Sequence, residues 1–283
     1  MASKTFALVL SLITLLTLAC NLTALLGSQP TPTAIDLPPT QLPSATPVTE
    51  EEQEVIYISQ PGSGSQVVSP VMVQGEADST FEQNLVIHVT GEDGSLLAEM
   101  PTTIQTPLGE RGPFSQEVTF SVSEQQAGRI SIFSASAMDG SLEHLSSAEV
   151  ILLPSGAAQI TQASTSQESI DILEPLPLAE ISGGSVAFSG FSDYYFESTL
   201  GVALCGAGDG SGNLDLLCGT TDNLLAQSSV IIEAPDIGQP GPYAGEIAYS
   251  VSATTPARLV IYASSPRDGG LIHVNSIPIQ LQP

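Results

Sequence analysis

One stretch of this sequence occurs twice, and the repetition constrains what the chain can fold into more than any other feature. Residues 77–89, ADSTFEQNLVIHV, return as residues 192–204, SDYYFESTLGVAL. Both copies keep an aspartate, a Phe-Glu pair and the same alternation of apolar residues, and the shared positions are Asp78, Phe81, Glu82, Asp193, Phe196 and Glu197. The chain is therefore predicted to contain two copies of one structural module.

The correspondence extends along both copies, with one change of spacing. The first block is repeated after 115 residues, whereas GPFSQEVTFSV at 112–122 returns as GPYAGEIAYSV at 241–251, after 129 residues. The difference of 14 residues falls between the third and fourth expected strands of the second copy. This insertion holds Cys205 and Cys218.

Each copy has the pattern of short antiparallel strands. Apolar and polar residues alternate in short runs separated by Gly, Pro, Asp and Ser, and no run keeps a helical period. Residues 85–89 and 200–204 have the same phase, so this strand presents one face to a core. Gly75 and Gly190 are expected at close backbone approaches or bulges, and the phenylalanine of each repeated turn is expected to plug the core.

The predicted fold is all-β: two tandem immunoglobulin-like antiparallel β-sandwiches that follow a disordered Pro/Thr-rich stalk. The stalk contains six prolines between residues 28 and 49 and no aromatic residue that would build a core. The predicted segments are a signal peptide over 1–20, the stalk over 21–53, the first sandwich over 54–154, a linker over 155–168, and the second sandwich over 169–283 with an inserted loop over 205–222.

The first residues resemble the signal of a bacterial lipoprotein. One lysine precedes an apolar run over residues 6–19, and Cys20 follows a small residue, so Cys20 is expected to be lipidated. The alternative is an uncut membrane helix over residues 6–26. Either anchor would hold the rest of the chain outside the cytoplasm, on the bacterial cell membrane.

The charge balance excludes two classes of partner. Thirty acidic residues face five basic ones, and the net charge is −25. Nucleic acid is excluded because phosphate binding needs clustered Lys and Arg, and an anionic membrane surface would repel the chain. Contact with the membrane is therefore expected only through the N-terminal lipid or helix.

The first copy resembles a known family. Its segments ISQPGSGSQVVSP, VQGEADSTFE and GEDGSLL, and the closing VILLP, follow the pattern of the immunoglobulin-like domain found in bacterial spore germination proteins. The second copy follows the same pattern with the insertion and a less similar beginning, ILEPLPLAEISGGS. The resemblance implies an immunoglobulin-like sandwich in an extracytoplasmic protein and offers no catalytic residues to carry over.

Several repeated polar residues are candidates for a catalytic or ligand-binding site. Arg129 begins the sixth expected strand, as does its counterpart Arg258 in the second copy, and is expected nearer Glu92 and Asp93 than Glu82. His144 and His273 are equivalent, and we assign them to the hairpin before the last strand because no catalytic motif or second ligand accompanies them. His88 has no histidine counterpart and is expected at the surface.

The insertion suggests two further sites. Oxygen-bearing side chains alternate in a glycine-rich loop, as in calcium loops, at Asp209, Ser211, Asn213 and Asp215. The alternative is a polar loop without metal, and no other cofactor is expected. Cys205 and Cys218 would face each other across the neck of the loop, and export permits a disulfide, so we expect one; the alternative is two buried thiols.

These features predict a protein that is not an enzyme. We expect a membrane-tethered, extracytoplasmic binding or scaffolding protein of the bacterial cell envelope, whose partner is an envelope protein or surface ligand. The alternatives are a purely structural surface spacer, a calcium-binding adhesion module and a hydrolase.

Overall fold

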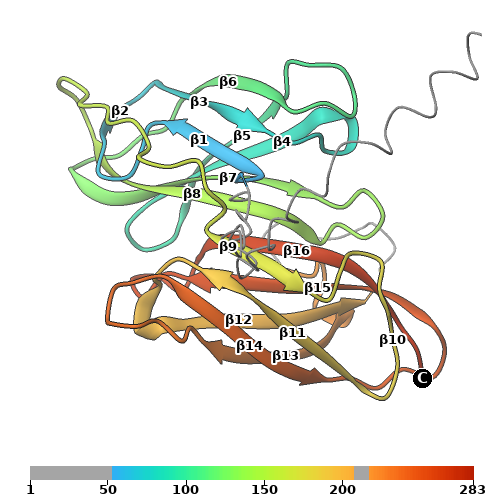
Figure 1. Cartoon of the computed structure of the whole chain (residues 1–283). Helices are drawn as coiled ribbons and strands as arrows, with labels where there is room; N and C mark the ends of the chain where they lie inside the picture. Colours follow the sequence, from blue (N-terminus) through green and yellow to red (C-terminus); the bar gives the residue numbers. More distant parts are fainter. Residues whose placement is uncertain (1–52, 207–216) are drawn as a thin grey trace, which may run out of the picture. The chain divides into compact units, whose positions relative to one another are not determined.

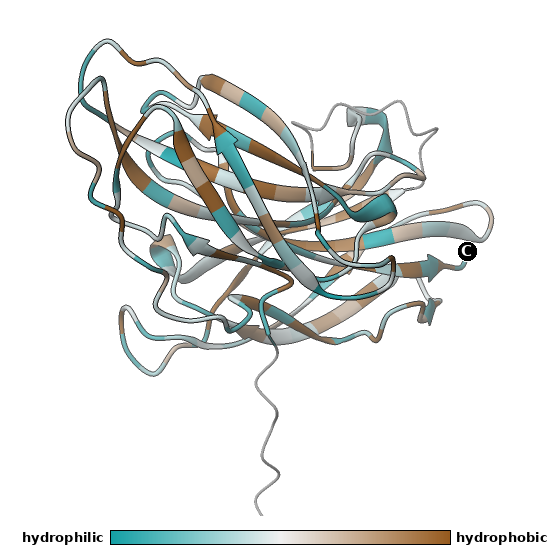
Figure 2. Ribbon diagram, turned by 90° about the horizontal axis from the view of Figure 1, so that it is seen from above, coloured by the Kyte–Doolittle hydropathy of each residue, from teal (hydrophilic) through white to brown (hydrophobic). Residues whose placement is uncertain are grey.

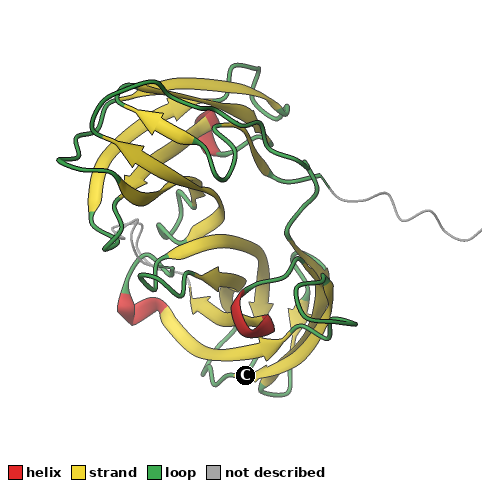
Figure 3. Ribbon diagram, turned by 90° about the vertical axis from the view of Figure 1, so that its left-hand side faces the viewer, coloured by secondary structure: helices red, strands yellow, loops and turns green. Residues whose placement is uncertain are grey.

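The computed structural model describes residues 53–206 and 217–283 (Figure 1). Strands are the main secondary structure of these residues, and the helical elements among them are three short 3-10 turns, coloured red in Figure 3. Hydrophobic and hydrophilic residues alternate along many strands, as Figure 2 shows. The fold class predicted from the sequence is confirmed: the chain forms tandem immunoglobulin-like β-sandwiches.

The first sandwich consists of two sheets around one apolar core. One sheet has the order β1-β3-β6, and the other has the order β5-β4-β7-β8, with the short β2 parallel to β8. The core includes Ile56, Phe114 and Ile132. The strands are β1 (Ile56–Gln60), β2 (Gln66–Val68), β3 (Val71–Ala77), β4 (Asn84–Thr90), β5 (Leu96–Thr103), β6 (Gly112–Val118), β7 (Gln126–Ala135) and β8 (Leu142–Leu153).

The second sandwich repeats this arrangement strand for strand. One sheet has the order β9-β11-β14, and the other has the order β13-β12-β15-β16, with the short β10 parallel to β16. The core includes Ile170, Phe188 and Tyr243. The strands are β9 (Ile170–Glu174), β10 (Glu180–Ile181), β11 (Ser185–Ser192), β12 (Thr199–Gly206), β13 (Leu224–Ile231), β14 (Gly241–Ala248), β15 (Thr255–Ser264) and β16 (Leu271–Leu281).

The two sandwiches are joined edge to edge through β8 and β16. These strands pair antiparallel, with Leu145 opposite Val274, and so merge the two larger sheets into one 10-stranded sheet. Leu145 and Val274 are the same position in the two copies, since they lie 129 residues apart. Gln53 and Gln167, which also occupy equivalent positions, form a second antiparallel bridge. A local two-fold axis therefore passes through both pairs.

An apolar cluster covers one face of the β8–β16 pair. It is separate from the cores of the two sandwiches and draws residues from both of them: Phe133, Leu142, Leu145, Ala203, Cys205, Cys218, Val260 and Val274. Side chains alternate between the faces of a strand, so His144 and His273 project from the opposite face to their neighbours in this cluster. The pair thus has an apolar face and a polar face.

The predictions for the repeated glycines are confirmed, whereas those for the repeated phenylalanines are wrong. Gly75 and Gly190 each lie where a neighbouring carbonyl and an aromatic ring leave no room for a side chain, and the pairing next to each is irregular, which confirms the expected close approaches. Phe81 and Phe196, however, are 61% and 56% exposed, so the prediction that they plug the core is wrong. In the first copy the buried Gln83 occupies the inward position and donates to nearby carbonyls.

Cys205 and Cys218 form the disulfide that the sequence predicts, with Cα atoms 5.2 Å apart. Replacing both by alanine should lower the free energy of unfolding by about 3 kcal/mol, because the bridge closes a short loop in the unfolded chain. Chemical denaturation of both proteins, with and without reductant, measures this difference. Reductant should destabilise the native chain and leave the variant unchanged; alkylation of both cysteines in the unreduced protein would contradict the bridge.

Some predictions lie outside the described residues. These are the signal peptide with Cys20, nearly all of the stalk, and the candidate calcium ligands Asp209, Ser211, Asn213 and Asp215. Over residues 53–206 and 217–283, no helix is long and apolar enough to cross a membrane.

Candidate functional site

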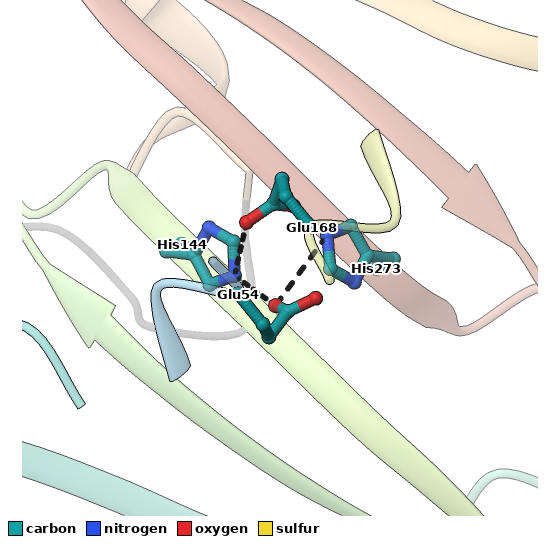
Figure 4. A group of neighbouring side chains, drawn as sticks. All are labelled: Glu54, His144, Glu168 and His273. Carbon is teal, nitrogen blue, oxygen red and sulfur yellow. Dashed lines mark hydrogen bonds and ion pairs between the residues drawn. The ribbon is translucent and has the colours of Figure 1, made fainter. Parts of the chain in front are cut away.

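Four buried ionisable side chains meet on the polar face of the β8–β16 pair (Figure 4). Each sandwich supplies one glutamate and one histidine. Glu54 stands just before β1 and His144 lies in β8; Glu168 stands just before β9 and His273 lies in β16. Their donor atoms all lie within 4.8 Å of one another. We call these four residues the His-Glu cluster.

The contacts within the His-Glu cluster follow the local two-fold axis. His144 Nε2 lies 2.7 Å from Glu54 Oε1, and His273 Nε2 lies 2.8 Å from Glu168 Oε1. Each imidazole also approaches the glutamate of the other sandwich, at 3.9 Å in both cases. The backbone repeats the exchange, because the N–H of Ser169 donates to Glu54 and that of Val55 donates to Glu168, both at 3.2 Å. Each sandwich therefore binds the carboxylate of the other.

Burial makes the charges of the His-Glu cluster interdependent. All four side chains are at most 8% exposed. Burial by itself raises the pKa of Glu54, but the nearby His273 and hydrogen bonds from His144 and Ser146 outweigh it and hold this pKa below its usual range. Burial opposes a charged His273, yet Glu54 and Glu168 together raise the pKa of its imidazole. The carboxylates thus favour an adjacent positive charge.

The geometry does not fit nucleophilic catalysis. Ser146 lies 3.2 Å from His144, but its hydroxyl donates to Glu54 at 2.6 Å. A catalytic triad needs the carboxylate on the other imidazole nitrogen, where it orients the ring. In His144 that nitrogen, Nδ1, is buried and has no hydrogen-bond partner among the described residues. Two imidazoles and two carboxylates instead make a set of four donors that can hold a metal ion.

Ion pairs between the sandwiches lie on the face of the β8–β16 pair that carries the apolar cluster, since Arg129 and Asp268 line one cleft with Phe133 and Leu145. Arg129 contacts Asp268 of the second sandwich at 2.9 Å and Glu149 of its own at 2.7 Å. Arg258, its counterpart in the second copy, contacts Glu143 of the first sandwich at 3.1 Å. In the structure Arg129 thus forms ion pairs across the junction, in addition to the local structural role expected for it.

Hydroxyl groups also join the two sandwiches. Ser147 donates to the carbonyl of Ile272 at 2.7 Å, and Ser276 donates to the carbonyl of Glu143 at 2.6 Å. The two serines are equivalent residues, and so are the two acceptors, which lie 129 positions apart in each case. The junction is therefore built from matched pairs of the residues that the repeat has in common.

The Arg129–Asp268 contact should make stability sensitive to acid. Burial raises the pKa of Asp268, but hydrogen bonds from Arg129 and from the Gly270 N–H prevail and hold the pKa at about 2. A pKa that is lower in the folded chain gives stability that is present above about pH 4 and lost as the pH falls toward 2, here roughly 2 kcal/mol. Unfolding measured from pH 5 to 2 should show this loss, and Asp268→Asn should flatten the curve; an unchanged slope would contradict the assignment.

The sequence did not reveal the His-Glu cluster. His144 and His273 were assigned to hairpins, but both are buried in the closing strands. The partners that were missing are Glu54 and Glu168, each placed two residues before the first strand of its copy. That shared position was the only signal in the sequence. His88 was expected at the surface, whereas it is 8% exposed and contacts Glu99 at 3.0 Å.

Comparison with solved structures shows only distant likenesses. A crystal structure of red sea bream transglutaminase matches at 13% identity and a TM-score of 0.27, over 82% of this chain and 31% of that one. A crystal structure of dimeric latent PorU from Porphyromonas gingivalis matches at 10% identity and a TM-score of 0.24, over 81% of this chain and 24% of that one. The titin domains z1z2, in complex with telethonin, match at 13% identity and a TM-score of 0.18, over 81% of this chain and 96% of that one. At these TM-scores the likenesses support no argument about this chain.

Comparison of the sequence finds one family model that is similar to part of the chain. No curated protein matches it. Residues 55–141, which begin at the first sandwich and reach the turn before β8, match the model of the immunoglobulin-like domain of bacterial spore germination. The match confirms the resemblance seen in the segments of the first copy. This part of the chain is therefore similar to the immunoglobulin-like domain of bacterial spore germination.

Proposed function

We propose that this chain is a non-catalytic, extracytoplasmic scaffold of the bacterial cell envelope that binds another envelope protein. The edge-to-edge joining of the two sandwiches through β8 and β16 carries the proposal. Domains that set a distance gain length when they follow one another end to end. Side-by-side pairing gives up that length and fixes the surfaces of both sandwiches relative to each other, which favours recognition over a spacer role.

The surface chemistry supports a basic partner. Each of the four arginines already forms an ion pair with a carboxylate of the same chain, and the only lysine is Lys4. Most of the thirty acidic residues therefore have no basic side chain of this protein to neutralise them. Such a field attracts cationic surfaces and accelerates their association.

The repeated Phe-Glu turns offer a defined place for contact. Phe81 and Phe196 are exposed in equivalent 3-10 turns, one on each sandwich. The next residue in each turn, Glu82 or Glu197, has a positive φ, 54° and 56°. This conformation costs a residue with a side chain about 1 kcal/mol or more, yet both copies adopt it. An exposed ring beside a carboxylate suits a partner surface that has both apolar and basic groups.

Crosslinking on intact cells tests the proposal. Cells carrying the native chain should yield a defined crosslinked partner with a basic surface. The double variant Phe81→Ser and Phe196→Ser should lose that product, while its unfolding transition stays in place because both rings are exposed. Ile237→Ser removes a side chain that is 88% exposed elsewhere on the second sandwich and should retain the partner. Absence of any specific product from the native chain would indicate a spacer; a product retained by the double variant would show that recognition occurs elsewhere.

A further inference from the structure

We infer that the His-Glu cluster is a zinc site that fastens the two sandwiches to each other. Four donors from four separate segments converge there: Glu54 and His144 from the first sandwich, Glu168 and His273 from the second. The proposed recognition function does not depend on zinc binding. A result that overturns the zinc site would therefore leave the proposed function unaffected.

The distances fit a small tetrahedral ion. Zinc bound by histidine nitrogen and carboxylate oxygen at about 2.0–2.2 Å has neighbouring donors about 3.3–3.5 Å apart. The nitrogen-to-oxygen contacts here are 2.7, 2.8, 3.9 and 3.9 Å, and of the two that Glu168 makes, His273 contacts its Oε1 and His144 its Oε2. One ligand atom from each of the four side chains lies within 4.8 Å of the other three, so changes of about 1.5 Å or less bring all six distances to the edge length of the tetrahedron. Side-chain rotation alone supplies a shift of this size.

Charge also favours a dication. With both carboxylates ionised and both imidazoles neutral, the His-Glu cluster carries two buried negative charges, which is costly without a compensating ion. Two protons could compensate, but one would then place a full charge on His144, whose Nδ1 lacks a hydrogen-bond partner among the described residues. One divalent ion compensates both carboxylates while each imidazole stays neutral and binds through Nε2.

The donor types select the metal. Calcium takes six to eight oxygen ligands and magnesium keeps an octahedral shell, so neither suits two imidazoles and two carboxylates. Zinc accepts this mixed set in four-coordinate form. Four protein donors leave no position for a reacting water, which is the arrangement of structural zinc sites rather than catalytic ones. Cys205 and Cys218 do not compete for the ion, because they are joined in a disulfide.

A route for the ion leads in from one side. Glu54 and His273 line a cleft of about 320 Å³. Ser146 and Ser169 line the same cleft and both donate hydrogen bonds to Glu54, so the cleft is polar where it meets the cluster. A hydrated ion can therefore approach Glu54 and His273 first and exchange its waters for the remaining donors.

Zinc binding to the full-length chain tests the inference. After treatment with chelator and dialysis against zinc, the native chain should retain one zinc per chain by elemental analysis, and its melting temperature should rise with zinc concentration. His144→Asn and His273→Asn should each abolish retention of the ion. His88→Asn is the matched control: it removes the third histidine, also buried and paired with a glutamate, and should leave one zinc per chain.

Cobalt provides a readout that does not depend on the variants folding. The native chain loaded with Co²⁺ should show the intense visible bands of a tetrahedral ion, and zinc should displace them. No retained zinc and no thermal shift in the native chain would overturn the inference and leave a proton-linked cluster. Retention that survives in folded His144→Asn, or an octahedral cobalt spectrum, would also overturn it.

Discussion

Replacing Arg129 with alanine should lower the free energy of unfolding by about 3–5 kcal/mol. The Arg129 side chain is 3% exposed, and that of Asp268 is fully covered. Removing the guanidinium leaves the Asp268 carboxylate buried without its main partner, and removes the contact with Glu149. Chemical denaturation, with the fit checked for a second transition, gives the size of the loss.

Two further variants separate the charge effect from loss of packing. Arg111→Ala removes another arginine with a 2.7 Å contact, but its partner Asp78 is 52% exposed, so the cost should stay below about 1 kcal/mol. Combining Arg129→Met with Asp268→Leu removes both buried charges and should recover most of the stability. If Arg129→Ala costs no more than Arg111→Ala, the pair between the sandwiches contributes little.

Replacing Gly190 with alanine should cost about 3–4 kcal/mol, through overpacking and loss of a hydrogen bond. A methyl group on Gly190 would overlap the carbonyl oxygen of Asp171 and the ring of Tyr243. The Tyr243 hydroxyl donates to that same carbonyl at 2.8 Å, so relief of the overlap separates β9 from β11 and breaks this bond. Thermal and chemical unfolding should both show the decrease.

Gly206→Ala is the matched control for this substitution. Gly206 also lies in a strand of the second sandwich, but the nearest atoms to an added methyl group belong to the flexible Leu225 side chain, at 3.3 Å. Because alanine restricts the unfolded chain more than glycine does, this variant should be neutral or slightly more stable. Equal losses at the two positions would mean that the close backbone approach is not the cause.

The strands and the glycine positions could be read from the sequence because they depend on local pattern. Alternation predicts the residues that share the core face, and the in-phase apolar residues of 85–89 and 200–204 do enter the two cores. The other face of these strands is covered as well at His88 and Ala203, which alternation did not predict. The disulfide was predictable because Cys205 and Cys218 lie at two ends of one loop. Each of these inferences needs only residues that are close together in sequence or paired within one sandwich.

The junction between the sandwiches could not be read in this way. Arg129 and His144 repeat at matching positions, which looks like local structure when each copy is considered alone. Across the junction, the partner of Arg129 is Asp268, 139 residues away, and the partner of Arg258 is Glu143, 115 residues away. The residue pattern within a strand does not show which outer strands of the two sandwiches pair with each other. The sequence therefore showed that these polar residues repeat, but it did not show that they meet at the junction.

The outward position of Phe81 was missed for a different reason. An aromatic residue in a turn that occurs in both copies is usually assigned to a core, since burial of a ring is strongly favourable. Here the positive φ of Glu82 and Gln83 turns the chain so that Gln83 points inward and binds carbonyls. Backbone conformation of this kind is costly for residues with side chains and is therefore not expected from sequence.

The two-fold axis through Leu145 and Val274 gives the chain the organisation of a homodimer whose subunits have been fused. In a true dimer of identical subunits, one surface meets itself, and every substitution appears on both sides of the axis at once. Fusion removes that restriction. One half can have a short loop while the other has a longer loop with a disulfide, as the half with Cys205 and Cys218 does. The equivalent serines, histidines and glutamates near the axis form contacts in which both halves take part. A substitution in either half would therefore break a contact that both halves make.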